Sequence, residues 1–411
     1  MPRRNLVIVS TLGVLIAGLA IGQRRIQEAV AANAVEAPRF EVDPMWPKPL
    51  PNHWTLGMTI GVGIDSRDHV FIIHRGAAEM HRAEQGADPI GNRPAEAECC
   101  RPAPPVLEFD PEGNLVKAWG GPSTGAPVWP VSNHGISVDK EDNVWIGGNG
   151  RCSDSLVTAG ECKVAGSVDS YMLKFTHDGK FLAQFGADGQ RIDSKAMDHF
   201  GMVARINFDP KASEAFIADG YGNHRVAVVD DKTGAIKRIW GAYGNVPSDS
   251  NFGRYNPDAP MISQFRTPVH CAVPSNDGFV YVCDRPNDRL QVFTKDGKFV
   301  KEKVYYPKTL GDGSVWDVAF SRDPQQKYMY MADGKNERVY VIDRQSLEIL
   351  TMFGDGGRQP GQFFAVHSIA TDSKGNIYTT ETYRGQRVQK FVYKGIAPVT
   401  KMNQGVVWPS K

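Results

Sequence analysis

The stretch RINFDPKASEAFIADGYGNHRVAVV, residues 205–229, contains the pattern that decides the fold. Two short runs of alternating apolar and polar residues flank a turn that begins at Asp209, and an Asp-Gly turn leads to a third run that begins at Arg225. A period of two, enrichment in β-branched and aromatic residues, and turns of this kind predict three consecutive antiparallel strands.

The same unit of three strands recurs six times along the chain, at a spacing of about 40–50 residues. The units begin near Thr59, Asn133, Arg205, His270, Trp316 and His367. Repeats of this length predict an all-β protein that forms a six-bladed β-propeller, because closing the ring removes free sheet edges. We expect one propeller domain over residues 38–411.

Three stretches break this period, and a short motif recurs within it. Residues 76–105, 151–169 and 244–264 are rich in Gly, Pro and charged residues, so we expect loops there. The recurrent Asn-x-Arg-Val/Leu motif and the Asp-Gly turns that follow third strands resemble NHL repeats. The predicted propeller is therefore of the NHL type.

Three histidines occupy matching places at the starts of inner strands. They are His134 in NHGISVD, His270 in VHCAVP and His367 in VHSIATD, and they belong to units two, four and six. Alternate blades of a six-bladed ring lie about 120 degrees apart, so the three imidazoles should converge at one mouth of the channel. Three protein ligands with an open position are the pattern of catalytic zinc, although imidazole also suits copper, iron or nickel.

Two residues that do not recur are expected at the same mouth, where second strands end. They are Arg75 in the first unit and Tyr221 in the third. An Arg can hold a carboxylate by two parallel hydrogen bonds, and a Tyr can act as a base. Both are predicted catalytic residues.

The bulk composition excludes some classes of partner. Among 411 residues, 47 basic residues balance 46 acidic ones, for a formal net charge of +1. A nucleic-acid partner would usually require a basic surface, so we expect none. We expect a monomer that acts on a small-molecule or peptide substrate.

The N-terminus differs from the rest of the chain. Arg3 and Arg4 precede an apolar run from Leu6 to about Ile21, and small residues follow at 29–34. This order predicts a signal peptide or an N-terminal membrane anchor over residues 1–34. On either interpretation, the folded part is exported, to the periplasm or as a secreted protein.

Six cysteines fit an oxidising compartment. Cys152 and Cys162 can close the short insertion that they flank, and Cys271 and Cys283 lie on adjacent predicted strands of one unit. Cys99 and Cys100 are adjacent, so we expect at most one of them to have an easy local partner. The sequence contains no Cys-x-x-Cys motif, so we do not expect a cysteine metal site.

The segments around these residues resemble the peptidyl-α-hydroxyglycine α-amidating lyase family. VFIIHRG resembles its active-site Arg segment, ADGYGNHRV its active-site Tyr segment, and NHGISVD, TPVH and AVHS its three zinc-His segments. All five segments keep the family's order over most of the propeller. The resemblance implies zinc on the three histidines and catalytic roles for Tyr221 and Arg75.

One position departs from the family pattern. Ser368 stands where the family has an Asp that holds a structural calcium. A neutral hydroxyl is a poorer calcium ligand than a carboxylate, although backbone carbonyls near Val62 and Ile136 can still contribute. The sequence therefore supports zinc better than calcium.

The resemblance implies a zinc-dependent carbon–nitrogen lyase that converts an α-hydroxyglycine-type substrate to an amide and glyoxylate. Two other functions fit the same propeller. One is a metal-dependent lactonase or hydrolase that uses zinc-bound water, and the other is an NHL platform that binds a partner without catalysis.

Overall fold

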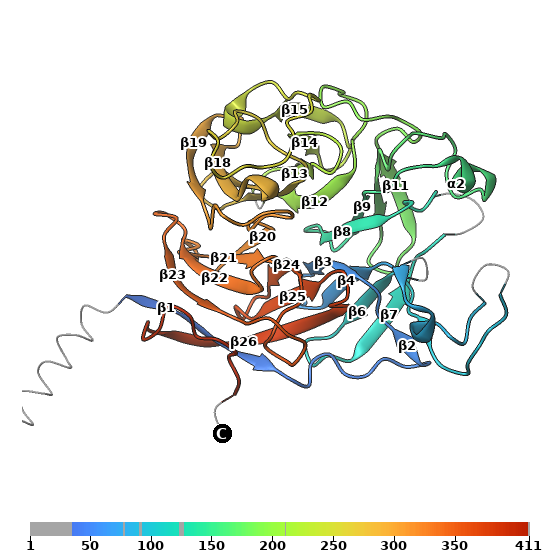
Figure 1. Cartoon of the computed structure of the whole chain (residues 1–411), viewed down its shortest axis with the longest axis horizontal. Helices are drawn as coiled ribbons and strands as arrows, with labels where there is room; N and C mark the ends of the chain where they lie inside the picture. The colour runs from blue at the N-terminus through green and yellow to red at the C-terminus, as the bar shows by residue number, and fades with distance from the viewer. Residues whose placement is uncertain (1–34, 77–78, 90–92, 123–126, 210, 410–411) are drawn as a thin grey trace, which may run out of the picture.

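The computed structural model describes residues 35–76, 79–89, 93–122, 127–209 and 211–409. Six four-stranded antiparallel sheets are arranged around a common centre (Figure 1). The predicted signal peptide or anchor, residues 1–34, lies outside the described residues. Within the described ranges, no helix is long and apolar enough to cross a membrane.

In the first three blades, the strands follow one another from the centre of the ring to its rim. Blade one contains β3 (Thr59–Ile64), β4 (Val70–His74), β6 (Val106–Phe109) and β7 (Leu115–Trp119). Blade two contains β8 (Asn133–Val138), β9 (Val144–Gly148), β10 (Met172–Phe175) and β11 (Phe181–Phe185). Blade three contains β12 (Val203–Phe208), β13 (Glu214–Asp219), β14 (Arg225–Asp230) and β15 (Ile236–Trp240).

The next two blades follow the same order, and the last one uses both ends of the chain. Blade four contains β16 (Val269–Pro274), β17 (Phe279–Asp284), β18 (Arg289–Thr294) and β19 (Phe299–Val304). Blade five contains β20 (Asp317–Phe320), β21 (Tyr328–Asp333), β22 (Arg338–Asp343) and β23 (Ile349–Phe353). Blade six contains β24 (Val366–Thr371), β25 (Ile377–Glu381), β26 (Arg387–Pro398) and β1 (Glu36–Asp43).

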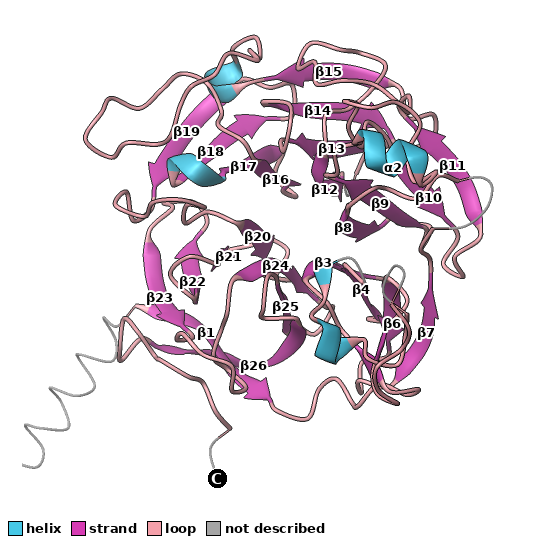
Figure 2. Ribbon diagram, turned by 45° about the vertical axis from the view of Figure 1, so that its right-hand side comes forward, coloured by secondary structure: helices cyan, strands magenta, loops and turns pink. Residues whose placement is uncertain are grey.

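The inner strands close a ring, which confirms the predicted six-bladed propeller. Each of them contacts the inner strand of the next blade, and β24 contacts β3. Figure 2 shows these six strands nearest the centre. Because each blade packs against two others, the second strands are buried on both faces, as in β21, where all six residues are buried. This packing explains their near-continuous apolar character.

The N-terminal strand completes the ring, a point that the repeats left undecided. Strand β1 pairs antiparallel with β26, and Phe40 of β1 packs on Tyr330 and Phe353 of blade five. The propeller sheet therefore begins at Glu36, slightly before the expected boundary. Joining the two ends of the chain in one sheet removes the edge that β26 would otherwise expose.

The stretches that break the period carry little regular structure. Within 76–105, η2 (Arg82–Glu84) precedes β5 (Arg101–Pro102), which pairs parallel with β2 (Trp54–Thr55). Within 151–169 lies the single-turn α2 (Asp154–Thr158). Two more short helices among the described residues are η3 (Ala242–Gly244) and η4 (Arg285–Asn287).

All six cysteines form disulfides. Cys152–Cys162 and Cys271–Cys283 are paired as the sequence suggested. The expectation for the adjacent pair was wrong, because Cys99 and Cys100 are bonded to each other. Each bond joins residues at most 12 positions apart, so the disulfides brace single blades or loops rather than link distant ones.

Candidate metal centre

The structure brings His134, His270 and His367 together at the mouth of the channel. They come from β8, β16 and β24, all three are buried, and one nitrogen of each lies within 4.8 Å of those of the others. The three histidines are separated by up to 233 positions in the sequence, so only the closed ring of blades makes them neighbours. The three residues form a facial set of nitrogen donors.

Local bulges aim these side chains. The pairing of β16 with β17 skips His270, and the pairing of β24 with β25 skips His367. A residue left out of the ladder bends its strand and can redirect its side chain. In β8 the skipped residue is Gly135, with a φ of +54°, and a Cβ there would lie 2.4 Å from the carbonyl oxygen of Ala204. Glycine is therefore required next to His134.

The hydrogen bonds of the imidazoles set which nitrogen faces the centre. His134 Nδ1 donates to the carbonyl of Ala204 at 2.9 Å, and His270 Nδ1 donates to the carbonyl of Trp316 at 2.5 Å. Their Nε2 atoms then carry lone pairs, and His270 Nε2 lies 3.2 Å from His367 Nε2. Backbone carbonyls orient metal-binding imidazoles in this way.

These donors fit a metal ion. Lone pairs that point at one another repel unless a proton or a cation lies between them, and burial disfavours the proton. Among the described residues, His367 Nδ1 is a buried nitrogen without a hydrogen-bond partner, so no protein acceptor sets the tautomer of this ring, and a cation at the centre would take the Nε2 lone pair. Three imidazoles and an open side match the donor set of a catalytic zinc site.

Burial keeps the three imidazoles uncharged. It lowers the pKa of His134, His270 and His367 well below the usual value for histidine. Nearby Arg75 lowers the pKa of His134 further, and Arg285 does the same for His270. Neutral imidazole is the form that binds a metal, so the site is ready for a cation at neutral pH.

This burial predicts how stability depends on pH in metal-free protein. Unfolded histidine has a pKa of about 6.5, so below that pH the unfolded chain binds protons that the folded chain excludes. Stability should therefore fall as pH decreases below about 6.5, by at most about 4 kcal/mol per pH unit for three protons. Urea unfolding of chelator-treated protein, at a series of pH values between 7.5 and 5, measures this loss of stability.

The control for that series is a variant with Gln at positions 134, 270 and 367. Other titrating groups, such as buried carboxylates, are shared by both proteins, so the difference between the two slopes isolates the three histidines. Parallel loss of stability in both would mean that the imidazoles are not held neutral by the fold.

Tyr221 contacts two of the three imidazoles. Its hydroxyl is 3.1 Å from His134 Nε2 and 3.1 Å from His270 Nε2. It has one proton and can donate to only one of them. The phenol oxygen therefore sits where a group bound at the centre would meet it.

Arg285 is a functional candidate that the sequence analysis missed. Its Nη1 lies 3.4 Å from the Tyr221 hydroxyl, and its guanidinium stacks 4.4 Å above the Trp316 ring. It follows β17 as Arg75 follows β4, so comparing the residue after every second strand would have revealed it. The side chain is 7% exposed, so little solvent screens its charge at the mouth.

Arg75 lies beside His134 rather than at Tyr221. Its Nη2 donates to Asn149 Oδ1 at 2.6 Å, its Nε reaches the carbonyl of Asn133 at 3.4 Å, and Glu79 lies 3.3 Å from its Nη1. The residue before His134 is thus held by Arg75. In this structure, the guanidinium that contacts Tyr221 is that of Arg285.

A charged cavity of about 820 Å³ opens next to Tyr221 and Arg285. Its charged lining residues are Arg151, Arg254, Arg266, Arg285, Asp249 and Asp312. Four arginines against two aspartates leave an excess of two positive charges, not counting His224. A cavity of this volume and charge suits an anionic ligand larger than glyoxylate.

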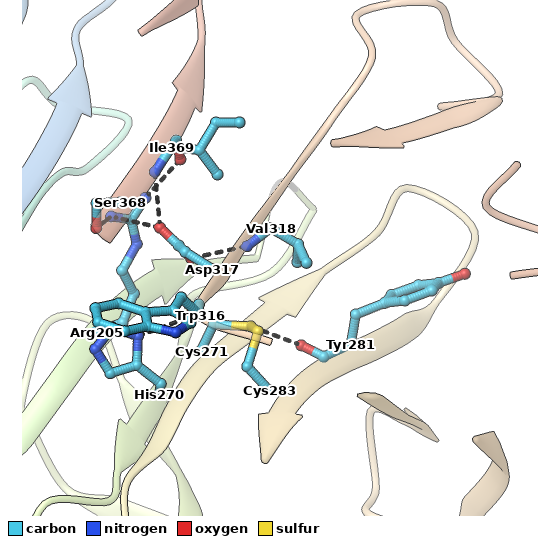
Figure 3. Close-up of a disulfide and its surroundings, with 10 residues drawn as sticks. All are labelled: Arg205, His270, Cys271, Tyr281, Cys283, Trp316, Asp317, Val318, Ser368 and Ile369. Atoms are coloured by element: carbon cyan, nitrogen blue, oxygen red, sulfur yellow. Dashed lines mark hydrogen bonds and ion pairs between the residues drawn. A yellow bond between two sulfur atoms is a disulfide. The ribbon is translucent and has the colours of Figure 1, made fainter. Parts of the chain in front are cut away.

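Further down the channel, a guanidinium takes the position considered for calcium. Arg205 Nη1 donates to Ser368 Oγ at 2.8 Å and lies 3.2 Å from Asp317 Oδ2 (Figure 3). Two cations at one hydroxyl repel each other. The residues around Ser368 therefore do not fit calcium, and Arg205 supplies the positive charge there.

The acidic residues that end second strands have structural partners. Three of them bind the Arg that begins the third strand, in the pairs Asp219–Arg225, Asp284–Arg289 and Glu381–Arg387, at 2.8, 2.6 and 2.6 Å. The fourth, Asp333, accepts hydrogen bonds from the backbone of Lys335 and Asn336. These residues stabilise blades and turns rather than form the site.

Comparison with protein-family models finds no match. Curated proteins do match over most of the chain. Peptidyl-glycine alpha-amidating monooxygenase B of Xenopus laevis is 25% identical over 361 residues, which cover 84% of this chain and 34% of the monooxygenase. This chain therefore spans about a third of that relative's length.

Two further relatives are matched over more of their own length. Peptidyl-alpha-hydroxyglycine alpha-amidating lyase 1 of Drosophila melanogaster is 24% identical over 372 residues, 86% of this chain and 59% of the lyase. NHL repeat-containing protein 3 of Mus musculus is 23% identical over 375 residues, 87% of this chain and 85% of that protein.

Among solved structures, an inactive variant of virginiamycin B lyase from Staphylococcus aureus with quinupristin aligns with a TM-score of 0.43 and 13% identity, over 86% of this chain and 88% of the lyase. A streptogramin B lyase aligns with a TM-score of 0.44 and 10% identity, over 87% and 98% of the two chains. In sequence, over more than four fifths of its length, this propeller resembles the peptidyl-α-hydroxyglycine α-amidating lyases and an NHL-repeat protein.

Proposed function

We propose that this protein is a zinc-dependent lyase that cleaves the carbon–nitrogen bond of an α-hydroxyglycine-type substrate to give an amide and glyoxylate. One observation carries the proposal: the Tyr221 hydroxyl lies 3.1 Å from two of three converging imidazoles, with Arg285 beside it. The name of the Drosophila relative supports the same reaction class.

The reaction requires one proton to move and one bond to break. In its phenolate form, Tyr221 accepts the proton of the substrate hydroxyl, and the electron pair of that O–H bond forms the carbonyl of glyoxylate. The C–N electron pair leaves with the amide nitrogen, which recovers the proton from Tyr221. A zinc ion bound by the three histidines would supply Lewis acidity at the hydroxyl oxygen.

The arginines position the reacting groups. Arg285 donates toward the Tyr221 oxygen and holds it over the imidazoles. Arg75 fixes the backbone that precedes His134, and the excess positive charge of the cavity attracts the substrate carboxylate. Bidentate binding of a carboxylate by arginine would orient the carbinol carbon toward Tyr221.

The disulfides fit the same picture of an exported enzyme. Three of them occur among the described residues, and disulfides persist in oxidising compartments. We propose that the protein acts outside the cytoplasm as a monomer on peptidyl or small acyl substrates.

The identity of the reaction products tests this proposal. Zinc-loaded protein is incubated with α-hydroxyhippurate, and glyoxylate and benzamide are measured by chromatography. Equal amounts of both products are expected. Ring-opened acid from lactones, without glyoxylate from α-hydroxyhippurate, would instead make the protein a hydrolase, and no turnover of either substrate would favour a binding platform.

Replacing Tyr221 by Phe tests the base directly. We expect kcat for glyoxylate release to fall by about 10²–10⁴-fold, the usual contribution of a positioned acid–base group. The zinc content should not change, since the phenol is not one of the three nitrogen donors. Steady-state kinetics and elemental analysis on the same preparation measure both.

Tyr378→Phe is the matched control. Tyr378 is buried in blade six, away from the imidazoles, and its hydroxyl donates to Asp372 Oδ2 at 3.1 Å. Its kcat should stay near the wild-type value. A Tyr221→Phe variant with undiminished kcat would remove Tyr221 from the mechanism.

A further inference from the structure

A second cluster of metal-binding side chains lies at the other end of blades one and two. It contains Asp65, His69, Glu108 and His177, whose ligand atoms all lie within 4.8 Å of one another, and we call it the Asp65 cluster. Asp65 follows the last residue of β3, whereas the three histidines of the metal centre stand at or near the starts of inner strands. The two sites therefore lie at opposite faces of the ring.

The cluster joins two blades. Asp65 and His69 flank the turn between β3 and β4, and Glu108 lies on β6 of the same blade. His177 comes from the turn between β10 and β11 of blade two, and its ring packs edge-on against Phe71 at 5.0 Å. A ligand bound by all four residues would tie the first blade to the second.

The distances fit a four-coordinate ion. His177 Nε2 lies 3.1 Å from Asp65 Oδ2 and 3.3 Å from Glu108 Oε1, and His69 Nδ1 lies 2.6 Å from Glu108 Oε1. Ligands bonded to one tetrahedral zinc ion at 2.0–2.1 Å are about 3.3 Å apart. The two separations from His177 are close to this value, and the one between His69 and Glu108 would have to widen.

Protein groups satisfy Asp65, whose Oδ1 accepts from the backbone N–H groups of Arg67 and His69, but they leave one oxygen of Glu108 unpaired. Asp65 and Glu108 have almost fully buried carboxylates, with 0% and 1% of their side chains exposed. Among the described residues, Glu108 Oε2 is a buried oxygen without a hydrogen-bond partner, on the carboxylate whose other oxygen contacts both histidines. Buried carboxylates without full compensation are costly.

The only guanidinium that contacts both carboxylates in the described structure is that of Arg67. It bonds to Asp65 Oδ2 at 3.0 Å and lies 3.7 Å from Glu108 Oε1, while 54% of its side chain is exposed. Arg67 therefore supplies one positive charge beside two buried carboxylates.

His177 Nε2 reveals a conflict. It faces two carboxylate oxygens and also contacts the Arg67 guanidinium. The nitrogen would have to donate to the carboxylates and accept from Arg67 at once, which one imidazole nitrogen cannot do. A cation among the four ligands removes the conflict, because all four then act as electron-pair donors.

We propose that Asp65, His69, Glu108 and His177 bind a divalent transition-metal ion, with zinc as the best match, and that this ion is structural. Two imidazoles and two carboxylates suit first-row divalent metals, and four protein ligands close the coordination sphere as in structural zinc sites. Arg67, on the exposed side, moves out when the metal binds. The proposal does not depend on the proposed lyase activity.

The test uses the full chain with Ala at positions 134, 270 and 367, so that only the second site is counted. Chelator-treated protein is titrated with Zn²⁺ alone, and bound zinc is measured by elemental analysis after gel filtration. About one zinc per chain is expected, together with a higher Tm in zinc than in chelator.

Three further substitutions in this background separate a metal site from an ion-pair network. Glu108→Gln and His177→Ala should each lower zinc affinity by at least tenfold and remove the rise in Tm. His177 is partly exposed, so its variant remains informative if Glu108→Gln fails to fold. Arg67→Ala should bind zinc at least as tightly as its parent, because a competing cation is gone.

Two outcomes would overturn the proposal. One is that the parent chain takes up no zinc and its Tm does not rise when zinc is added. The other is uptake that His177→Ala and Glu108→Gln leave unchanged, which would locate the ion elsewhere. If Arg67→Ala lowers the Tm and the chain binds no zinc, the cluster is an ion-pair network centred on Arg67.

Discussion

Replacing His270 by Ala is expected to remove zinc from the metal centre and to lower glyoxylate release at least about 1,000-fold. The loss of Lewis-acid stabilisation amounts to several kcal/mol, and each 1.36 kcal/mol corresponds to tenfold in rate. Two imidazoles remain, but Tyr221 also loses one of its two contacts at 3.1 Å. Zinc content and kcat/KM are measured on the same preparation.

His199→Ala is the control for the loss of an imidazole. His199 is also largely buried, but its ring bonds to Asp198 and to the carbonyl of Arg191, away from the channel. The His199→Ala protein should keep its zinc and its rate of glyoxylate release. A His270→Ala protein that retains both zinc at this centre and full turnover would contradict the site assignment, whatever its second-site occupancy.

Replacing Arg205 by Met is expected to lower the free energy of unfolding by about 3–5 kcal/mol, the usual cost of leaving one partner of a buried ion pair. Asp317 is fully buried 3.2 Å away, and Arg205 also binds Ser368 of blade six. The substitution therefore breaks a link among blades three, five and six. Urea unfolding at pH 7 measures the change.

The pH dependence of this loss has a defined sign. Burial raises the pKa of Asp317, and Arg205 opposes that rise. Without Arg205, the folded chain must keep Asp317 protonated, while the unfolded chain releases the proton. The cost of Arg205→Met should therefore grow as pH increases.

A second substitution and an exposed pair provide the controls. Asp317→Asn in the Arg205→Met protein removes the unpaired charge and should recover at least half of the lost stability. Lys303→Met breaks the exposed pair with Glu348 and should cost no more than about 1 kcal/mol. If Arg205→Met costs as little as Lys303→Met, Arg205 does not hold the channel together.

The repeat pattern was sufficient to predict the architecture. Alternation and turn residues are local signals, and their sixfold recurrence implies a ring because an open stack of blades would expose the apolar faces of its first and last blades. The same reasoning predicted that His134, His270 and His367 would meet, since equivalent positions in a ring converge whatever their separation in sequence.

Other features depend on contacts between blades, which the repeat pattern does not describe. Strand β1 has no repeat signal of its own, and it becomes the outer strand of blade six only because β26 offers a free edge. Arg285 reaches Tyr221 from the next blade, and Arg205 reaches Ser368 across 163 positions. Such contacts depend on the width of the channel and the length of each side chain.

The sequence by itself determined the fold class, the number of blades and the three imidazoles, because each follows from a pattern that repeats. Only the tertiary structure decided what surrounds them: the bulges that aim His270 and His367, the guanidinium in place of calcium, and the Asp65 cluster at the far face. These features arise where different blades meet. Contacts between residues that are not equivalent in the repeat produce no repeating pattern in the sequence.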